Sequence, residues 1–429
     1  MSAEHEESQN GAPTSAQAHT APASSASPVR LHAVDALRAL ALLGIISVNV
    51  WFFARPDTIV GALTGELDTA QPTGADQVVR FTSSLLFEGK SYVVFSFLFG
   101  LSFVLAWARA AETGASEARR SLRRSAALIV LGALHGIFLF FGDILLAYGI
   151  LGMLLLAVRR ISAKPALIIA GCLYALVMAV VLGSAALMAM MDAAAGGDAM
   201  GGGFDFGLSA EDVTEAYTGS IGSYLLYQLI AWIVMVFNIL LGQGPLAFAA
   251  FLVGLVVGRA RLIERLLAGE FATGRLLAMA LPALAFGLLV SGLGSWLAWG
   301  PPGTAGHDGG AWAMMGQALA LAAGPIQSFG YVVVLLLAFR SGAFDWLVRL
   351  LAPAGRMSLT NYLLQSLVLM LIFAAPGLGL AGQLEAGAVG GIVLALWAAQ
   401  LLVSHLWFAK FKRGPLEAPV RAWTYREKA

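Results

Sequence analysis

Long apolar runs separated by short polar loops fill the chain from Val34 to Phe408. A membrane-spanning helix needs about 20 mainly apolar residues, and most of the runs approach this length. We expect spans at roughly 34–53, 91–108, 125–141, 143–158, 165–190, 221–241, 245–258, 276–299, 312–338, 357–375 and 386–408. The pattern therefore predicts an all-α fold: a polytopic transmembrane helical bundle of about ten crossings, with room for one re-entrant or interfacial helix.

The segments outside the apolar region predict the domain organisation. Residues 1–29 are rich in Ser, Ala, Pro and Gln and lack the basic start and apolar centre of a signal peptide. We expect them to form a disordered cytoplasmic tail, followed by the helical bundle over 30–410 and a cytoplasmic tail over 411–429. The first span would then act as an uncleaved signal anchor.

Basic residues predict the topology, because cytoplasmic loops of membrane proteins carry an excess of Lys and Arg. They cluster in the ranges 109–124, 159–164, 259–275, 340–356 and 410–413, while the 192–217 loop is acidic. We therefore expect both termini in the cytoplasm. Only one net crossing fits between 192–217 and 259–275, so one of the two runs flanking Gly242–Pro245 is expected to be partly inserted or re-entrant.

Composition excludes several classes of protein. The chain is 59% hydrophobic and 12% charged, whereas soluble domains carry roughly 25% charged residues. A net charge of +1 gives no reason to expect nucleic acid as a partner, and the single cysteine, Cys172, excludes an intrachain disulfide. The spans hold too few His and Cys residues for a haem or metal centre, so no metal is expected.

Ionisable residues within spans are costly and are usually functional or paired. His135 lies mid-span between Gly132 and Gly136, which would bring another backbone close. Asp143 follows eight residues later, beyond a break at Gly142 that lets the chain turn back. A carboxylate beside a histidine would orient it as a general base. The alternative is a buried neutral histidine bonded to a neighbouring carbonyl group.

Other polar residues extend the candidate site. Asp35 and Arg38 share a helix face at i and i+3 and form either an interfacial ion pair or part of a site. Lys90 would face outward, where it either snorkels or holds an anion. The segment 355–366 is either a structural hydrogen-bonding patch or the wall of a hydrated cavity. The remaining candidates are Asn49, Tyr148, Arg356, Ser358, Thr360, Asn361 and Gln365.

These motifs resemble the YeiB-like family of bacterial inner-membrane proteins. The resemblance rests on Val34–Arg38 with Asn49, on Glu88–Gly100, on His135 with Asp143–Tyr148, on Gly355–Ser366 and on Gly414–Glu417. The first span also resembles the opening of the heparan-α-glucosaminide N-acetyltransferase family and, more distantly, other transmembrane acyltransferases. That resemblance implies a membrane enzyme that uses cytoplasmic acyl-CoA to modify an acceptor on the far side, with Asn49 in the site. The histidine that follows this asparagine in the glucosaminide enzymes has no counterpart in residues 51–65.

The sequence leaves two main functions open. In an acyltransferase, Arg356, Ser358 and Thr360 would bind the phosphates of acyl-CoA. His135 and Asp143 would then be catalytic, and Lys90 or Asn49 would stabilise the oxyanion. Asp35, Arg38, Tyr148, Asn361 and Gln365 would help to bind a small-molecule, sugar or lipid acceptor.

The alternative is a transporter or lipid-handling protein with a polar intramembrane path, favoured by the break at Gly242–Pro245. A membrane scaffold without a ligand is a third reading. Membrane lipids are expected partners in each case, and homo-oligomers remain open.

Overall fold

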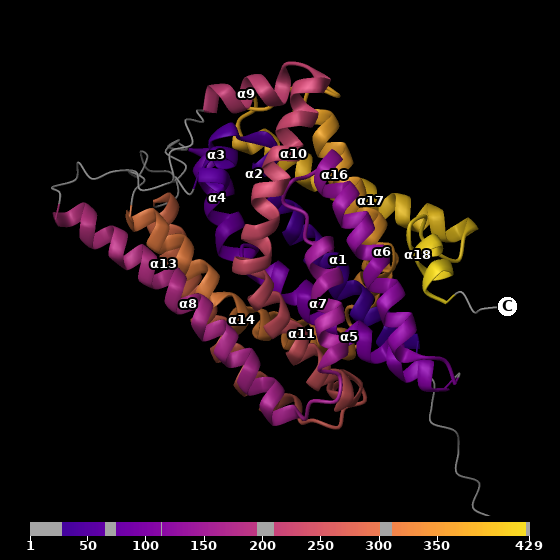
Figure 1. Ribbon diagram of the computed structural model, residues 1–429. Coiled ribbons are helices and arrows are strands. Elements are labelled where there is room, and N and C mark those ends of the chain that lie inside the picture. The colour runs from indigo at the N-terminus through magenta and orange to yellow at the C-terminus, as the bar shows by residue number, and fades with distance from the viewer. Residues whose placement is uncertain (1–27, 65–73, 113, 195–209, 301–310, 426–429) are drawn as a thin grey trace, which may run out of the picture.

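The chain folds into a bundle of helices, and the all-α prediction is confirmed (Figure 1). The structure, a computed structural model, describes residues 28–64, 74–112, 114–194, 210–300 and 311–425, and no strand occurs among them. The helices are α1 (Pro28–Asn49), α2 (Trp51–Ala54), α3 (Pro56–Thr64), α4 (Ala75–Leu86), α5 (Lys90–Glu112), α6 (Glu117–Phe138), α7 (Leu145–Ala157), α8 (Ala163–Ala194), α9 (Ala210–Thr218), α10 (Ile221–Asn238), α11 (Gly244–Arg259), α12 (Leu262–Leu267), α13 (Thr273–Trp299), α14 (Ala311–Arg340), α15 (Asp345–Arg356), α16 (Ser358–Phe373), α17 (Ala386–Lys410) and α18 (Glu417–Thr424).

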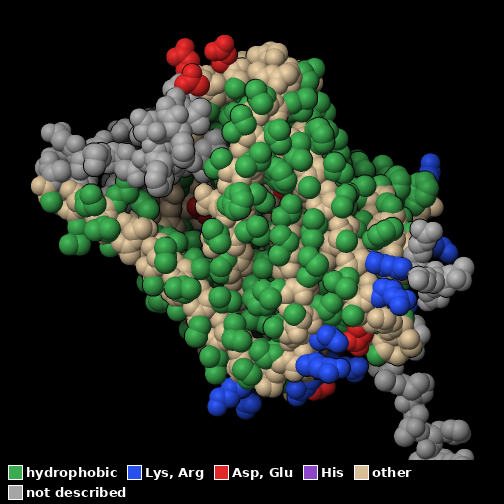
Figure 2. All heavy atoms as spheres, in the orientation of Figure 1, with side chains coloured by type: hydrophobic (Ala, Val, Ile, Leu, Met, Phe, Trp, Pro, Cys, Tyr) green, Lys and Arg blue, Asp and Glu red, His purple; other side chains and the backbone are tan. Residues whose placement is uncertain are grey.

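The surface of the bundle is that of a multi-pass membrane protein. Within the described ranges, eight helices are long and apolar enough to cross a membrane, and the bent pair α15–α16 makes a ninth. Large apolar side chains are exposed along α8, α10 and α13, including Val180, Phe237 and Leu289. Figure 2 shows acidic side chains gathered over α9, and Lys and Arg side chains collected toward the opposite end. A water-facing surface would not carry such an apolar belt between two charged ends.

The ten expected crossings count 221–258 once, and within the described ranges they correspond to the nine long spans, the bent pair included, and the short apolar helix α7. Helix α7 occupies the predicted span 143–158 but has only 13 residues, about 20 Å at the standard helical rise. The predicted runs 221–241 and 245–258 form one continuous helical span, Ile221–Arg259. A π-helical turn at Ile239–Gln243 joins α10 to α11, and the Tyr92 hydroxyl donates a hydrogen bond to the Gln243 carbonyl. Because the wider turn and this bond accommodate the Gly–Pro break, the re-entrant run expected there does not occur.

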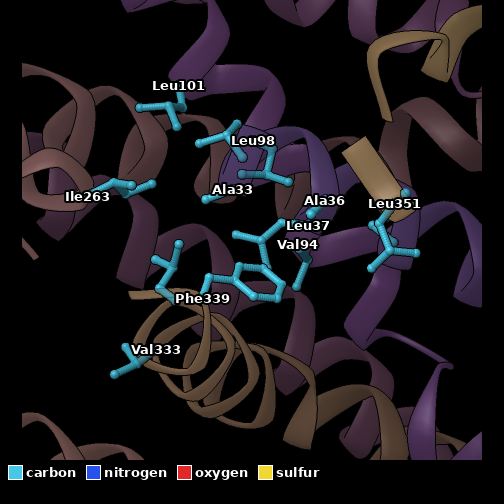
Figure 3. Packing of buried hydrophobic residues seen from close by; sticks show 14 of the residues in the cluster. Ala33, Ala36, Leu37, Val94, Leu98, Leu101, Ile263, Val333, Phe339 and Leu351 are labelled. Atoms are coloured by element: carbon cyan, nitrogen blue, oxygen red, sulfur yellow. The ribbon is translucent and has the colours of Figure 1, made fainter. Parts of the chain in front are cut away.

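Helix α1 lies in the packed interior and contacts α5, α14, α15, α16 and α17. Figure 3 shows its residues Ala33, Ala36 and Leu37 packed among apolar side chains of α5, α14 and α15. At Gly355 of α15 an added Cβ would overlap the backbone oxygen of Asp35. The two helices therefore touch backbone to backbone at this point.

The structure describes part of each predicted tail. Helix α1 begins at Pro28, and the rest of the predicted N-terminal tail lies outside the described residues. At the other end, residues 417–424 of the predicted C-terminal tail form α18, which packs against α6. Helix α18 thus covers one side of the bundle, next to the site described below.

Candidate functional site

A histidine–aspartate pair lies between α6 and α7. The two helices pack as a hairpin, and the turn between them returns Asp143 to His135. His135 Nδ1 lies 2.8 Å from Asp143 Oδ1, and both side chains are 0% exposed. The second carboxylate oxygen accepts a hydrogen bond of 2.8 Å from the Leu146 amide. Asp143 therefore holds the ring and also satisfies a backbone N–H in the first turn of α7.

Small residues on α6 permit this close packing. An added Cβ at Gly132 would overlap the Leu146 amide and the Asp143 carboxylate, so the predicted close approach occurs at this glycine. At Gly136 the neighbour is instead the indole of Trp232 on α10. Gln228 of α10 also donates a hydrogen bond of 3.1 Å to the Gly136 carbonyl. Helix α10 therefore covers the outer side of the pair.

The second ring nitrogen of His135 is buried and makes no hydrogen bond within the described part of the chain. A carboxylate is an acceptor, so it fixes the ring proton on Nδ1 and leaves the lone pair on Nε2. The ring of Tyr362, on α16, lies beside the imidazole with 5.1 Å between centroids. Asp143 thus orients the imidazole as in a general base, and Nε2, the atom that would accept a proton, has no hydrogen-bond partner in the described part of the chain.

A cavity of about 390 Å³ opens on the basic side of the bundle and ends against residues that border this pair, although His135 and Asp143 themselves do not line it. Its inner wall includes Ile144 and Leu145, which follow Asp143 directly, and Tyr362, which contacts the His135 ring. Helices α5, α6, α16 and α18 form the other walls. The charged residues that line it are Arg38, Arg120, Arg124, Arg421, Glu117 and Glu417.

Arg124 lies against the aromatic wall of the cavity. It donates a hydrogen bond of 2.8 Å to Ser102, and its guanidinium lies 4.7 Å and 4.5 Å from the ring centroids of Phe99 and Phe103. No carboxylate in the described ranges forms an ion pair with it, whereas Arg38 is paired with Asp35 at 2.6 Å. Sequence reasoning missed Arg124, because it belongs to an arginine cluster that the positive-inside rule already explained.

Glu417 of α18 occupies the N-terminus of α16. Its carboxylate accepts hydrogen bonds from the Leu359 amide at 2.9 Å, the Thr360 amide at 3.0 Å and the Thr360 hydroxyl at 2.6 Å. A carboxylate is favoured there because the first amides of a helix lack partners inside the helix. Thr360, a predicted phosphate ligand, is therefore already bonded within the protein.

The other two predicted phosphate ligands, Ser358 and Arg356, lie in different places. Ser358 lines the cavity. Arg356 does not line it: its guanidinium lies 4.0 Å from the Phe408 ring centroid and donates a hydrogen bond to the Lys412 carbonyl. The arginines in the cavity are thus a different set from the one that sequence reasoning selected.

Two polar residues of α16 face α17 and join these helices. Asn361 donates hydrogen bonds to the Ala354 carbonyl and the Ser404 hydroxyl, at 3.0 Å and 3.2 Å. Gln365 donates to Gln400 at 2.8 Å, and Gln400 donates to the Asn361 carbonyl at the same distance. Asn361 and Gln365 thus form a structural hydrogen-bonding patch, whereas Ser358 and Tyr362 of the same segment line the cavity.

The remaining predicted residues lie apart from the pair. The Tyr148 and Ser96 hydroxyls are 2.6 Å apart and buried. Lys90 is buried and donates a hydrogen bond of 2.9 Å to the Ser84 carbonyl, instead of facing outward. Asn49 is half-buried at the end of α1. None of the three forms a hydrogen bond with His135 or Asp143, whose partners are given above. Across the described ranges, no three His, Cys, Asp or Glu side chains are grouped so that they could hold a metal ion.

The fold and the site define a multi-pass α-helical membrane protein with a buried histidine–carboxylate pair beside an arginine-lined cavity. Residues 257–427 match the family described as "Protein of unknown function (DUF418)". The chain is 28% identical over 408 residues to the uncharacterized protein YxaH of Bacillus subtilis (strain 168), covering 92% of this chain and 94% of that protein. It is 26% identical over 412 residues to the uncharacterized protein YeiB of Escherichia coli (strain K12), with 92% and 94% covered. These matches support a YeiB-like family for the chain, as the sequence motifs predicted.

Proposed function

We propose that this protein is a membrane-embedded acyltransferase that takes an acyl group from acyl-CoA on the cytoplasmic side. The observation that carries the proposal is an arginine-lined cavity whose inner wall, Ile144, Leu145 and Tyr362, borders the buried His135–Asp143 pair. The resemblance of the first span to transmembrane acyltransferases agrees with it. The arginine-rich end of the bundle is then the cytoplasmic face, which agrees with both termini in the cytoplasm and with a bacterial inner membrane.

The charges of the cavity favour an anionic ligand that bears phosphate. Its two glutamates are engaged elsewhere, Glu417 with the α16 N-terminus and Glu117 with Arg159 at 3.7 Å. Arg124 therefore remains a cation without a carboxylate in a largely enclosed, aromatic environment. Arginine binds phosphate through several N–H donors at once, and the aromatic walls suit the organic part of such a ligand.

The pair behind the inner wall would supply the base. The acceptor hydroxyl or amine loses its proton to His135 Nε2, and its oxygen or nitrogen bonds to the thioester carbon. The carbon–sulfur bond then breaks, and the proton passes from His135 to the sulfur of CoA. Asp143 keeps the ring in the required tautomer throughout and stabilises the imidazolium. The acceptor is a small molecule, a sugar or a lipid.

The test is a panel of acyl-CoAs added to the detergent-purified protein, read by thermal shift and by loss of the thioester. A ligand that binds only the folded state raises the melting temperature by mass action. We expect Arg124→Gln to lose the shift, and His135→Ala to keep the shift but lose thioester turnover. His405→Ala is the matched control, because His405 lies exposed on α17. The absence of any shift with every acyl-CoA would overturn the proposal.

The transport alternative loses the feature that favoured it. A discontinuous helix at Gly242–Pro245 would have been typical of a transport site, but α10 and α11 form one continuous span. A solute flux driven by a pH gradient in liposomes, without thioester consumption, would reinstate this alternative.

A further inference from the structure

A second and larger cavity, of about 730 Å³, opens between α5, α8, α11, α13 and α14. Its walls are almost entirely aliphatic and aromatic. Val94, Ile263 and Val333, seen in Figure 3 within the apolar cluster around α1, also line it. The volume is in the range of about 300–1,000 Å³ that is typical of binding sites for organic ligands.

The polar groups of this cavity are already satisfied, with one exception. The Tyr174 hydroxyl donates a hydrogen bond to the Ala322 carbonyl, and the Ser328 hydroxyl donates to the Lys90 carbonyl. Arg275 is the only charged residue in the wall. It is exposed at the start of α13, and no ion pair joins it to a carboxylate in the described ranges. The cavity therefore offers an apolar interior with a single cation at one end.

This cation lies at the basic end of the bundle, in the 259–275 cluster. The lining residues of α8 are Leu167–Tyr174, close to the N-terminus of that helix, and those of α13 are its first residues. The cavity thus begins at the basic face and extends along α5, α11 and α14 into the bundle. A lipid of that leaflet would place its head group at Arg275 and its acyl chain among the apolar walls.

We infer that this cavity binds an anionic phospholipid, with the phosphate head group at Arg275 and an acyl chain between α8, α11 and α14. Each methylene group contributes about 0.8 kcal/mol to binding when it moves from water to an apolar site. An acyl chain that moves from the bilayer gains little of this free energy, because the bilayer interior is already apolar. Selection of the lipid therefore depends on its charge and on the fit of the chain to the walls.

The site is distinct from the one proposed for acyl transfer. Val93, Val94 and Phe97 of α5 line the lipid cavity, whereas Phe95, Phe99 and Phe103 line the arginine-lined cavity. The two cavities therefore lie on different faces of α5, and lipid binding is separable from thioester turnover.

The experiment uses a pair of glycines on α8. An added Cβ at Gly171 or at Gly183 would meet no atom within 4 Å, and both residues are exposed, but only Gly171 lines the cavity. Gly171→Leu places a side chain where the acyl chain would lie, and Gly183→Leu makes the same change outside. Arg275→Gln removes the charge, and its control is Arg349→Gln, at an arginine that is also exposed but does not line the cavity.

Each full-length variant is purified in neutral detergent, and phosphatidylglycerol or phosphatidylcholine with identical chains is added. Melting temperature and bound lipid, counted by native mass spectrometry, are the readouts. We expect phosphatidylglycerol to raise the melting temperature of the wild type by several degrees and to remain bound. Gly183→Leu and Arg349→Gln should respond like the wild type, and Gly171→Leu should respond to neither lipid. Arg275→Gln should respond equally to both.

Equal responses of Gly171→Leu and Gly183→Leu would overturn the inference, because lipid would then act only as a general solvent. Should Gly171→Leu fail to fold, the comparison of Arg275→Gln with Arg349→Gln decides: equal preference for phosphatidylglycerol in both would also refute it. Thioester turnover is measured on the same samples, so that failure of acyl transfer is seen separately.

Discussion

Two replacements of Asp143 distinguish its role in orienting the His135 ring from its role in stabilising the fold. In Asp143→Asn, the amide oxygen can still accept a hydrogen bond from the Leu146 amide, and the amide nitrogen then donates to His135 Nδ1. The ring proton must move to Nε2, the atom that has to accept a proton from the acceptor group. We therefore expect a folded protein whose thioester turnover falls by about 10²–10⁴-fold, the usual contribution of a general base.

Asp143→Ala removes both bonds and leaves the His135 Nδ1–H and the Leu146 amide without partners in a buried place. A buried donor without a partner costs about 1–3 kcal/mol, so the two together cost about 2–6 kcal/mol. This is a large part of a typical stability of about 5–15 kcal/mol, and the melting temperature should fall clearly. Thermal unfolding and acyl-CoA turnover are measured on both variants. Wild-type turnover in Asp143→Asn, alongside an inactive His135→Ala, would refute the orienting role of the carboxylate.

Three further predictions concern the packing around the site. Gly355→Ala should lower the melting temperature, because the added Cβ would overlap the Asp35 backbone. Gly274→Ala should not, because no atom lies near its Cβ position. Equal melting temperatures of the two variants would contradict the close approach of α1 and α15. Glu417→Ala removes three hydrogen bonds to the start of α16, so α18 should exchange its amide hydrogens faster in deuterium-exchange mass spectrometry, and unchanged protection would contradict this anchoring. Gln400→Ala leaves the buried Gln365 amide without its acceptor, which should destabilise the fold by about 1–3 kcal/mol. Binding of acyl-CoA should not change. Loss of binding at full stability would instead indicate a ligand path between α16 and α17.

The histidine–aspartate pair was predictable because every part of it is local. His135 and Asp143 are eight residues apart, Gly142 lies at the turn, and Gly132 allows α7 to approach. A hairpin of two antiparallel helices can still place such residues together or back to back, so the contact itself comes from the structure. The helices were predictable for the same reason. Each one lies within a continuous apolar run, whose composition reflects the lipid that surrounds that span.

The arginine-lined cavity could not be predicted, because its walls come from distant segments. Arg124 meets Ser102 across two helices, and Glu417 meets Thr360 at a separation of 57 residues. The sequence presents Arg124 as one of several basic residues in a cytoplasmic loop, and Glu417 as part of a polar tail. Only the packing of α18 against α6 shows that both belong to one cavity.

Helix α5 lines both cavities, and its sequence explains why hydrophobic periodicity does not predict them. A helix with one apolar stripe reveals which face is buried, but α5 is apolar on nearly all sides. One face carries Phe95, Phe99 and Phe103 toward arginines, and another carries Val93 and Phe97 toward the proposed lipid site. The chemistry of each cavity is therefore set by what the neighbouring helices contribute: Arg124 from α6 in one case, and Arg275 from α13 in the other. In a membrane protein such cations do two things at once, because the arginines that orient the bundle also supply the charge with which its cavities can select an anion.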